Sequence, residues 1–344
     1  MKKLKAFEKA LIVSNYHETL KDLGNKKIVF SPVEPTQSNL PNFSNYDPKA
    51  KINILEKTNS ISLDPSNGLD FINSYIPNIL GYDESYLSIK SLKGTVYFTC
   101  HCIVRLLPND FDPICLCTAN YFTRAKDTAK KSKVFHYVDA DKNQTIDSLF
   151  RAKLFEEKKG LLSDHMTNNS ILIIDGPLIG SMLGRKTMNL AKELLEKNII
   201  TVFVTKNSDS SLLINRLSTG NYNSDLDWAS DNLIAGTRSS YMRYFDKNGH
   251  QEEIFCYLKS FNNVSPLRVS FISDLLEDRD LINQIMEMLY YLVLDQGTPK
   301  DPQIRLISVA EMFAKDILKV SNPYGKVLQL GLVPTINQSR WGIG

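Results

Sequence analysis

The stretch that decides the fold is ILIIDGPLIG at residues 171–180, together with IITVFVTK at 199–206. Both begin with a mostly apolar run, which is typical of a strand buried on both faces of a sheet. Between them, residues 181–198 place leucines on one side of a predicted helix. This order predicts two parallel strands joined by a right-handed crossover. Asp175 then lies at the carboxyl end of a buried strand.

The sequence on either side extends this unit. A short apolar piece at 79–80 and longer stretches at 95–107 and 114–118 predict strands, and Pro108-Asn109-Asp110 predicts a turn between the last two. The later sequence predicts strands at 240–246, 253–259 and 267–271, and helices are expected at 145–162, about 274–296 and 303–320. The pattern favours the α/β class, with a mixed sheet flanked by helices.

The two ends of the chain differ from its middle. Residues 1–24 predict an amphipathic helix, with Leu4, Phe7 and Leu11 on its apolar face. Residues 31–70 are rich in Pro, Asn and Ser, which favours a long extended connection or a small insertion. We therefore expect an N-terminal helix and connection at 1–70, a main domain at 71–322 and a C-terminal tail at 323–344.

Composition excludes several classes of protein. Lys and Arg number 41 and Asp and Glu 38 in 344 residues, so the chain is no polycation, and any nucleic-acid surface must be a local patch. No stretch approaches the roughly 18 apolar residues that span a bilayer. Five cysteines, an odd number, argue against a secreted disulfide framework. We expect a cytoplasmic protein with no membrane partner.

Carboxylates occur at four places where a solvent-facing position is not the simplest explanation. Asp83 and Asp175 follow apolar runs, and Glu311 interrupts the apolar stripe of the last helix. At 100° per residue, Glu157 rather than Glu156 falls near the middle of the apolar stripe at 145–162. Inward carboxylates are costly unless they are paired or bind a metal ion, and several that converge favour Mn²⁺ or Mg²⁺.

A structural explanation stays open for each of these residues taken alone. A single inward carboxylate usually pairs with a nearby cation, such as Arg151 or Lys153. Lys206 ends the stretch at 199–206, next to the expected Asp175 strand, where it would reach a bound phosphate. The alternative for Lys206 is an ordinary lysine at a strand end.

Taken in order, several segments resemble motifs of the NurA nuclease family. ILIIDGPLIG is very close to the family's second aspartate motif, and NILGYDESY followed by KGTVYFTCHCIV resembles its first. SLFRAKLFEEKKGLL resembles the helix that carries the family's glutamate, and ITVFVTKNSDSSLL resembles a strand that ends in a lysine. GTRSSYMRYF, PLRVSF and PQIRLISVAEMFAK are similar to later motifs. The resemblance spans residues 76–318.

Two positions depart from the family pattern. Glu84 replaces the glycine that follows the first aspartate, and Glu311 replaces a histidine of the C-terminal helix. Glutamate still binds hard metal ions, but the second replacement removes a candidate general acid.

The resemblance implies an RNase H-like core, a homodimer, degradation of DNA with Mn²⁺, and a HerA-type hexameric ATPase as partner. One or two Mn²⁺ or Mg²⁺ ions would be held by Asp83, Asp175, Glu311 and Glu157, with Glu156 as the alternative to Glu157. Lys206 would offset charge that develops on the phosphate. The sequence has no Gly-x-x-x-x-Gly-Lys-Ser/Thr motif, so ATP hydrolysis by that route is not expected of this chain.

Positive charge is concentrated in FTRAKDTAKKSK at residues 122–133. A solvated loop is the alternative to a DNA-binding role for this run. We expect DNA phosphate contacts from Arg124, Lys126, Lys130, Lys131, Lys133 and, in a later motif, Arg238.

Four cysteines form two Cys-x-Cys pairs, Cys100 with Cys102 and Cys115 with Cys117. Zinc binding would make the protein a zinc-organised binding module. Zinc knuckles normally use Cys-x-x-Cys turns, whereas residues two apart on a strand share a face. We therefore favour packing within the hairpin, and zinc is the alternative.

Together with the carboxylates, the resemblance implies a metal-dependent deoxyribonuclease that acts on DNA ends with a HerA-type ATPase, in repair or antiviral defence. The alternative is a NurA-like adaptor that has lost catalysis and binds DNA or regulates the ATPase. The helix at 1–24 and the tail, which contains Trp341, are expected to contribute to assembly, unless both ends pack on their own domain.

Overall fold

A computed structural model describes residues 50–335, apart from 59, 77, 131, 140, 143, 181–182, 218–221, 247–250, 296–301 and 330. These residues belong to one compact unit, Asn39–Gly344. The predicted helix at 1–24 and the last nine residues of the tail lie outside the described residues.

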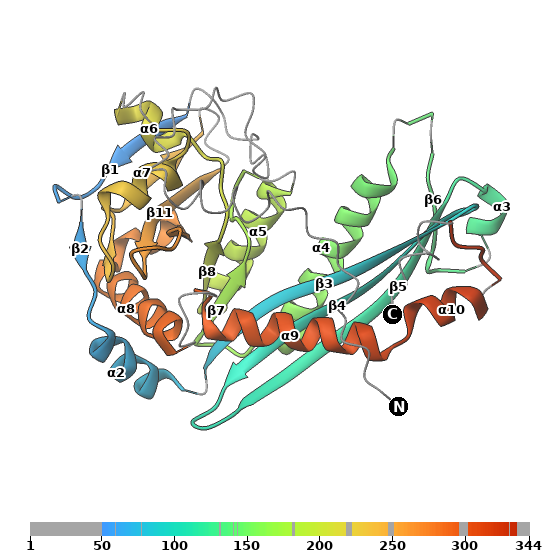
Figure 1. The fold of residues 1–344 in the computed structure, drawn as a ribbon, viewed down its shortest axis with the longest axis horizontal. Coiled ribbons are helices and arrows are strands. Elements are labelled where there is room, and N and C mark those ends of the chain that lie inside the picture. Colours follow the sequence, from blue (N-terminus) through green and yellow to red (C-terminus); the bar gives the residue numbers. More distant parts are fainter. Residues whose placement is uncertain are drawn as a thin grey trace, which may run out of the picture. The chain divides into compact units, whose positions relative to one another are not determined.

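The described residues are organised around one large sheet (Figure 1). Toward one edge lies an antiparallel meander of β3 (Ile79–Ser91), β4 (Gly94–Leu106) and β5 (Phe111–Thr123). Next to β3 lies β7 (Ser170–Asp175), parallel to it, followed by the parallel strand β8 (Ile199–Thr205). The order β5-β4-β3-β7-β8 is that of an RNase H-like sheet, which confirms the predicted fold class and the predicted crossover.

Further strands extend the sheet at both edges. Beyond β8 lie β12 (Leu267–Ile272), β11 (Glu252–Lys259), β10 (Met242–Phe245) and β1 (Lys51–Ile54), all antiparallel to their neighbours. At the opposite edge, β6 (Phe135–Tyr137) pairs in parallel with the end of β5. The short strands β2 (Ile61–Ser62) and β9 (Thr237–Arg238) pair with each other, and β9 also pairs with β11.

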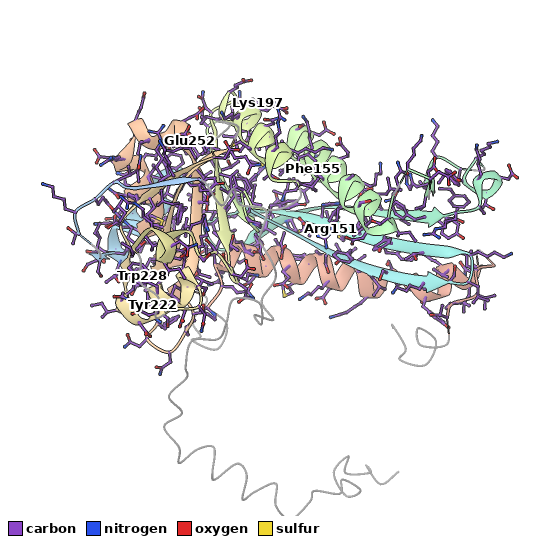
Figure 2. The ribbon with its side chains drawn as sticks, turned by 90° about the horizontal axis from the view of Figure 1, so that it is seen from above. Arg151, Phe155, Lys197, Tyr222, Trp228 and Glu252 are labelled. Atoms are coloured by element: carbon purple, nitrogen blue, oxygen red, sulfur yellow. The ribbon has the colours of Figure 1, made fainter. Side chains whose placement is uncertain are left out.

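Two helices cover opposite faces of the meander. Figure 2 shows α4 (Ile146–His165), which carries Arg151 and Phe155, on one side of the strands, and α9 (Arg305–Val320) on the other. α4 begins with a capping box between Thr145 and Ser148. Gly81 on β3 allows α9 to approach, because a Cβ at this position would come within 2.7 Å of Leu306 Cβ.

Three further long helices lie along the other part of the sheet. α5 (Gly184–Leu195) forms the crossover from β7 to β8, and α2 (Pro65–Tyr75) packs on α8 (Arg279–Asp295). None of the described helices combines the length and the apolar character that crossing a bilayer requires. The shorter helices are α3 (Lys126–Ala129), α6 (Leu212–Leu217), α7 (Asp225–Asn232), η2 (Ser273–Glu277) and α10 (Pro323–Gln329).

The structure differs from the sequence prediction in two places. Residues 50–70 are not an extended connection, because they contain β1, β2 and the start of α2. Asp64 caps α2 by accepting a hydrogen bond from Ser66 N. The strand predicted at 79–80 continues to Ser91, because β4 supplies a backbone partner along its polar half.

Candidate active site

Asp83 and Asp175 lie at the same level on neighbouring parallel strands. Tyr82 of β3 is the ladder partner of Ile174 of β7, so the next residues along the two strands are Asp83 and Asp175. Asp83 is 8% exposed. Burial, followed by the negative charge of Asp175, raises the pKa of Asp83 to about 8. The two carboxylates therefore repel each other and favour a cation beside them.

Two more charged residues, Lys206 and Glu311, lie near Asp175 and come from other parts of the fold. Lys206 directly follows β8, and its Nζ lies 2.6 Å from Asp175 Oδ2 and 3.9 Å from Glu311 Oε2 of α9. Lys315, one helical turn after Glu311, places its Nζ 2.6 Å from Glu311 Oε1. Burial raises the pKa of Asp175, and the charge of Lys206 partly offsets this effect. We call Asp83, Asp175 and Glu311 the acidic group.

The donor chemistry of the acidic group fits a hard divalent cation. Its carboxylate oxygens are the ligands that Mn²⁺ and Mg²⁺ prefer, and Asp83 is held in an environment where a nearby cation would favour its charged form. As the side chains lie, no three Asp, Glu, His or Cys residues of the described chain converge closely enough to hold an ion. Lys206 supplies the positive charge between Asp175 and Glu311 instead.

Glu157 faces inward as predicted, but it belongs to a different network. Its carboxylate accepts hydrogen bonds from Thr118 Oγ1 and Asn120 Nδ2 at 2.9 Å each, and from Thr99 Oγ1 at 3.1 Å. His101 Nε2 lies 3.3 Å away. Burial opposes ionisation, but the hydrogen bonds outweigh it and lower the pKa of Glu157.

The structure does not bring Glu157 to the acidic group. Cys102 is the ladder partner of Asp83, whereas Glu157 contacts His101, and neighbouring strand residues point to opposite faces. Glu157 therefore lies on the α4 face of the meander and Asp83 on the α9 face. Glu156 is exposed, and its Oε1 lies 3.4 Å from Lys186 Nζ. Neither glutamate reaches Asp83 in this arrangement.

The basic residues expected to contact DNA fall into two environments. Lys131 lies outside the described residues. Arg238 is buried at 2% exposure, and its guanidinium donates to both carboxylate oxygens of Glu56 and to Asn283 Oδ1. The expectation that Arg238 contacts DNA does not fit this structure, since its donors already have partners inside the fold. The residues that are exposed, at the end of β5 and around α3, are Arg124, Lys126, Lys130 and Lys133.

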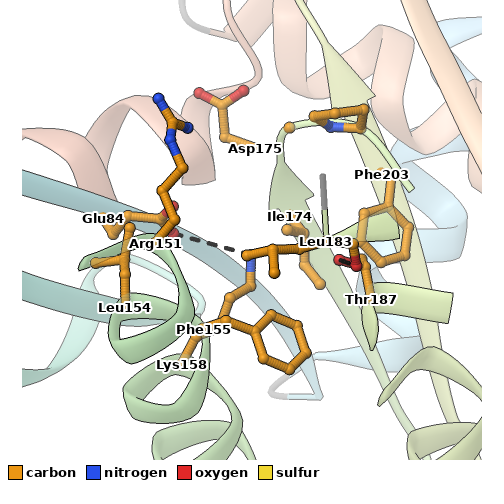
Figure 3. A pocket seen from close by; sticks show the side chains of 12 residues that line it. Glu84, Arg151, Leu154, Phe155, Lys158, Ile174, Asp175, Leu183, Thr187 and Phe203 are labelled. Carbon is orange, nitrogen blue, oxygen red and sulfur yellow. Dashed lines mark hydrogen bonds and ion pairs between the residues drawn. The ribbon is translucent and has the colours of Figure 1, made fainter. Parts of the chain in front are cut away.

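A cavity of about 230 Å³ lies beside Asp175, between α4, the end of β7 and the start of α5 (Figure 3). Phe155 and Phe203 contribute aromatic rings to its wall, and Arg151 and Lys158 contribute cations. Glu84 Oε2 is buried without a hydrogen-bond partner and lies 3.8 Å from Lys158 Nζ. The wall of the cavity thus contains apolar side chains together with two cations and a carboxylate.

The sequence prediction missed Glu84, Arg151 and Lys158 as site residues. Arg151 and Lys158 are seven residues apart on α4, a spacing that places both on one side of a helix and was a usable signal. In the sequence, Glu84 stands out only as a departure from a family motif. Strand alternation sends its side chain to the face opposite Asp83, toward the cavity.

The fold and the acidic group together define an RNase H-like α/β protein with carboxylates gathered from two parallel strands and a C-terminal helix. The family model described as NurA domain matches residues 115–315, more than half of the chain, and the chain therefore belongs to the NurA family. This match confirms the family expected from the motifs. No curated protein matches the chain in sequence.

Solved structures similar to the chain include three nucleases. The NurA nuclease from Sulfolobus solfataricus is 12% identical, with a TM-score of 0.45, covering 92% of this chain and 98% of that one. A structure of NurA with manganese is 10% identical, with a TM-score of 0.39, covering 73% and 92%. Endonuclease V from Bacillus subtilis is 9% identical, with a TM-score of 0.37, covering 78% and 87%. The family assignment rests on the sequence match.

Proposed function

We propose that the protein is a metal-dependent deoxyribonuclease that hydrolyses phosphodiester bonds at DNA ends. The observation that carries this proposal is the placement of Asp83 and Asp175 side by side, within a chain of the NurA family. A buried carboxylate (Asp83) and a half-buried one (Asp175) at the same level are costly on their own, and a divalent cation removes that cost.

Asp83 and Asp175 would hold Mn²⁺ or Mg²⁺, and Glu311 would join them once Lys206 releases Asp175. When bound, such an ion supplies Lewis-acid activation of water and stabilises the leaving oxygen. Lys206 would then turn its ammonium group from Asp175 to a non-bridging oxygen of the phosphate and offset the charge that develops there.

The cavity beside Asp175 would receive the nucleotide next to the cleaved bond. A nucleobase is flat and largely apolar on its faces, which suits Phe155 and Phe203, and its polar edge suits Lys158 and the Glu84 carboxylate, whose Oε2 has no hydrogen-bond partner. The exposed cations around α3, namely Arg124, Lys126, Lys130 and Lys133, would contact the phosphates of the flanking DNA.

The protein would work as a homodimer with a HerA-type hexameric ATPase. The family membership supports this part of the proposal, together with the lack of a phosphate-binding motor motif in the sequence. A translocating ATPase would supply DNA to a nuclease that has no motor of its own. DNA repair and antiviral defence are both settings in which such a pair would degrade DNA ends.

The test is cleavage of an end-labelled duplex in Mn²⁺ by Asp175→Asn, with Asp70→Asn as the matched control. Asp70 is exposed on α2, so its change should leave the rate unaltered. Asp175→Asn keeps the side-chain shape and removes a ligand charge, and we expect at least about a 100-fold loss of rate with an unchanged circular dichroism spectrum. A folded Asp175→Asn protein that cleaves at the wild-type rate would refute the assignment.

An inactive adaptor is the second candidate function. It is favoured by the way Lys206 and Lys315 already neutralise Asp175 and Glu311. If the wild-type protein binds the duplex but leaves it intact at millimolar Mn²⁺, the adaptor function is supported. Metal-dependent cleavage that is lost in Asp175→Asn would exclude it.

A further inference from the structure

Four of the five cysteines meet in one patch on the α9 face of the meander. Cys100 and Cys102 of β4 are the ladder partners of Cys117 and Cys115 of β5. In each of the two opposed pairs the Sγ atoms are 3.1 Å apart. The fifth residue, Cys256, is buried on β11, with its Sγ 3.7 Å from Met286 Sδ.

The geometry of the four sulfurs argues against zinc. Tetrahedral Zn²⁺ with Zn–S bonds of about 2.3 Å needs sulfurs roughly 3.8 Å apart in every pair. The opposed sulfurs are closer than that, at 3.1 Å. Packing within the hairpin, as favoured from the sequence, describes the arrangement better.

The two strands expose their sulfurs differently. Cys117 is exposed and Cys115 half-buried, whereas Cys100 and Cys102 on the neighbouring strand are buried. Hydrogen bonds with Cys100 and Cys102 also lower the pKa of Cys115. Each pair thus combines a β5 sulfur that a small oxidant can reach with a β4 sulfur that only its partner can reach.

We propose that the two opposed pairs are a site of reversible oxidation by hydroperoxides. A β5 thiolate attacks one peroxide oxygen and breaks the O–O bond, giving a sulfenic acid and, after protonation, water. The β4 sulfur then attacks the sulfenic sulfur, forms the S–S bond and expels the oxygen as a second water. Each pair therefore converts two thiols and one hydrogen peroxide into one disulfide and two waters.

The register of the pairs makes these disulfides easy to reduce. Directly opposed residues of an antiparallel ladder have Cβ atoms about 4.5–5.5 Å apart, whereas disulfides prefer about 3.5–4.5 Å. Closing the bond therefore strains the ladder, and strained disulfides are the labile ones. Because Cys102 is also the ladder partner of Asp83, the oxidation would occur beside the acidic group. The chemistry itself does not depend on nuclease activity.

The test uses the full-length reduced protein, treated with hydrogen peroxide and then denatured for a thiol count. We expect free thiols to fall from five to one, with Cys256 as the residue that remains alkylated in mass spectrometry. Dithiothreitol should restore all five. A count that stays at five, oxidation to sulfinic or sulfonic acid, or disulfides between chains would each overturn the proposal.

Two double variants check the pairing. Cys100→Ser/Cys117→Ser keeps one opposed pair and should still form one intramolecular disulfide. Cys100→Ser/Cys115→Ser keeps Cys102 and Cys117, which are diagonal and not opposed, and should form none. Equal cross-linking of the two variants would overturn the register argument, and the thiol count of the wild-type protein stands even if either variant fails to fold.

Discussion

Lys206 Nζ lies 2.6 Å from Asp175 Oδ2 and 3.9 Å from Glu311 Oε2. Lys206 directly follows β8, Asp175 ends β7 and Glu311 belongs to α9, and their contact places a protein cation inside the acidic group. A divalent ion that binds there competes with Lys206 for Asp175. The same lysine is therefore expected to oppose metal binding and to assist cleavage.

Lys206→Met separates these two effects. Removing the ammonium group should tighten Mn²⁺ binding about tenfold, since a like charge a few ångströms away disfavours the ion. It should also lower the single-turnover cleavage rate at saturating Mn²⁺ by roughly 10–100-fold, because charge on the phosphate is no longer offset. Calorimetric titration measures the affinity for Mn²⁺, and a quench experiment measures the single-turnover rate.

Lys197→Met, at an exposed position after α5, is the control. Weaker Mn²⁺ binding by Lys206→Met would contradict the proposed competition between Lys206 and the metal ion for Asp175.

Asp83→Asn should change how stability depends on pH. Burial, and then the charge of Asp175, raises the pKa of Asp83 to about 8 in the folded protein, whereas an unfolded aspartate titrates near about 3.9. The folded state therefore binds the extra proton, and the free energy of unfolding falls as pH rises through this window. From pH 6 to pH 9 without metal, the variant should gain on the order of 2 kcal/mol relative to wild type.

Urea unfolding at both pH values, in the presence of a chelator, measures this difference. Asp70→Asn serves again as the exposed control, and its stability relative to wild type should not change with pH. If the free energy of unfolding changed with pH by the same amount in wild type and in Asp83→Asn, Asp83 would be ionised throughout the range and the prediction would be wrong.

Glu157→Gln should be more damaging than Glu156→Gln. Glu157 accepts hydrogen bonds from Thr99, Thr118 and Asn120, and an amide places donors against donors there. We expect a loss of about 1–3 kcal/mol in the free energy of unfolding and a lower cleavage rate. Glu156 is exposed beside Lys186, so its change should stay within about 0.5 kcal/mol. Thermal unfolding of both variants measures these changes. A larger loss of stability for Glu156→Gln than for Glu157→Gln would contradict the hydrogen-bond network assigned to Glu157.

Truncation of either end should weaken assembly more than basal cleavage. We expect removal of residues 1–20 or 336–344 to reduce dimer formation or binding of the ATPase, since both segments carry apolar residues that include Leu4, Phe7, Leu11 and Trp341. The second deletion spares Thr335, whose N–H donates to Lys90 O. Mass photometry with and without the ATPase measures association. A chain that remains monomeric with full nuclease activity would refute the assembly proposal and leave the chemistry standing.

Local sequence patterns determined the main helices and strands and the direction in which several side chains point. The apolar runs at 171–174 and 199–204 became β7 and β8, the turn signal after β4 became a hairpin, and the 100° periodicity of α4 correctly turned Glu157 inward rather than Glu156. Each of these features depends on residues a few positions apart, so the printed sequence contains the necessary information.

Only the tertiary structure decided which of these residues meet. Asp83 joins Asp175 because β3 pairs in parallel with β7, and Lys206 joins them because β8 lies next to β7. Glu157 is separated from Asp83 because α4 covers the face of the meander opposite α9, and the guanidinium of Arg238 is paired inside the fold because Glu56, far away in sequence, lies beside it. Strand order, register and the face that a helix covers depend on long-range pairing, which no local pattern specifies.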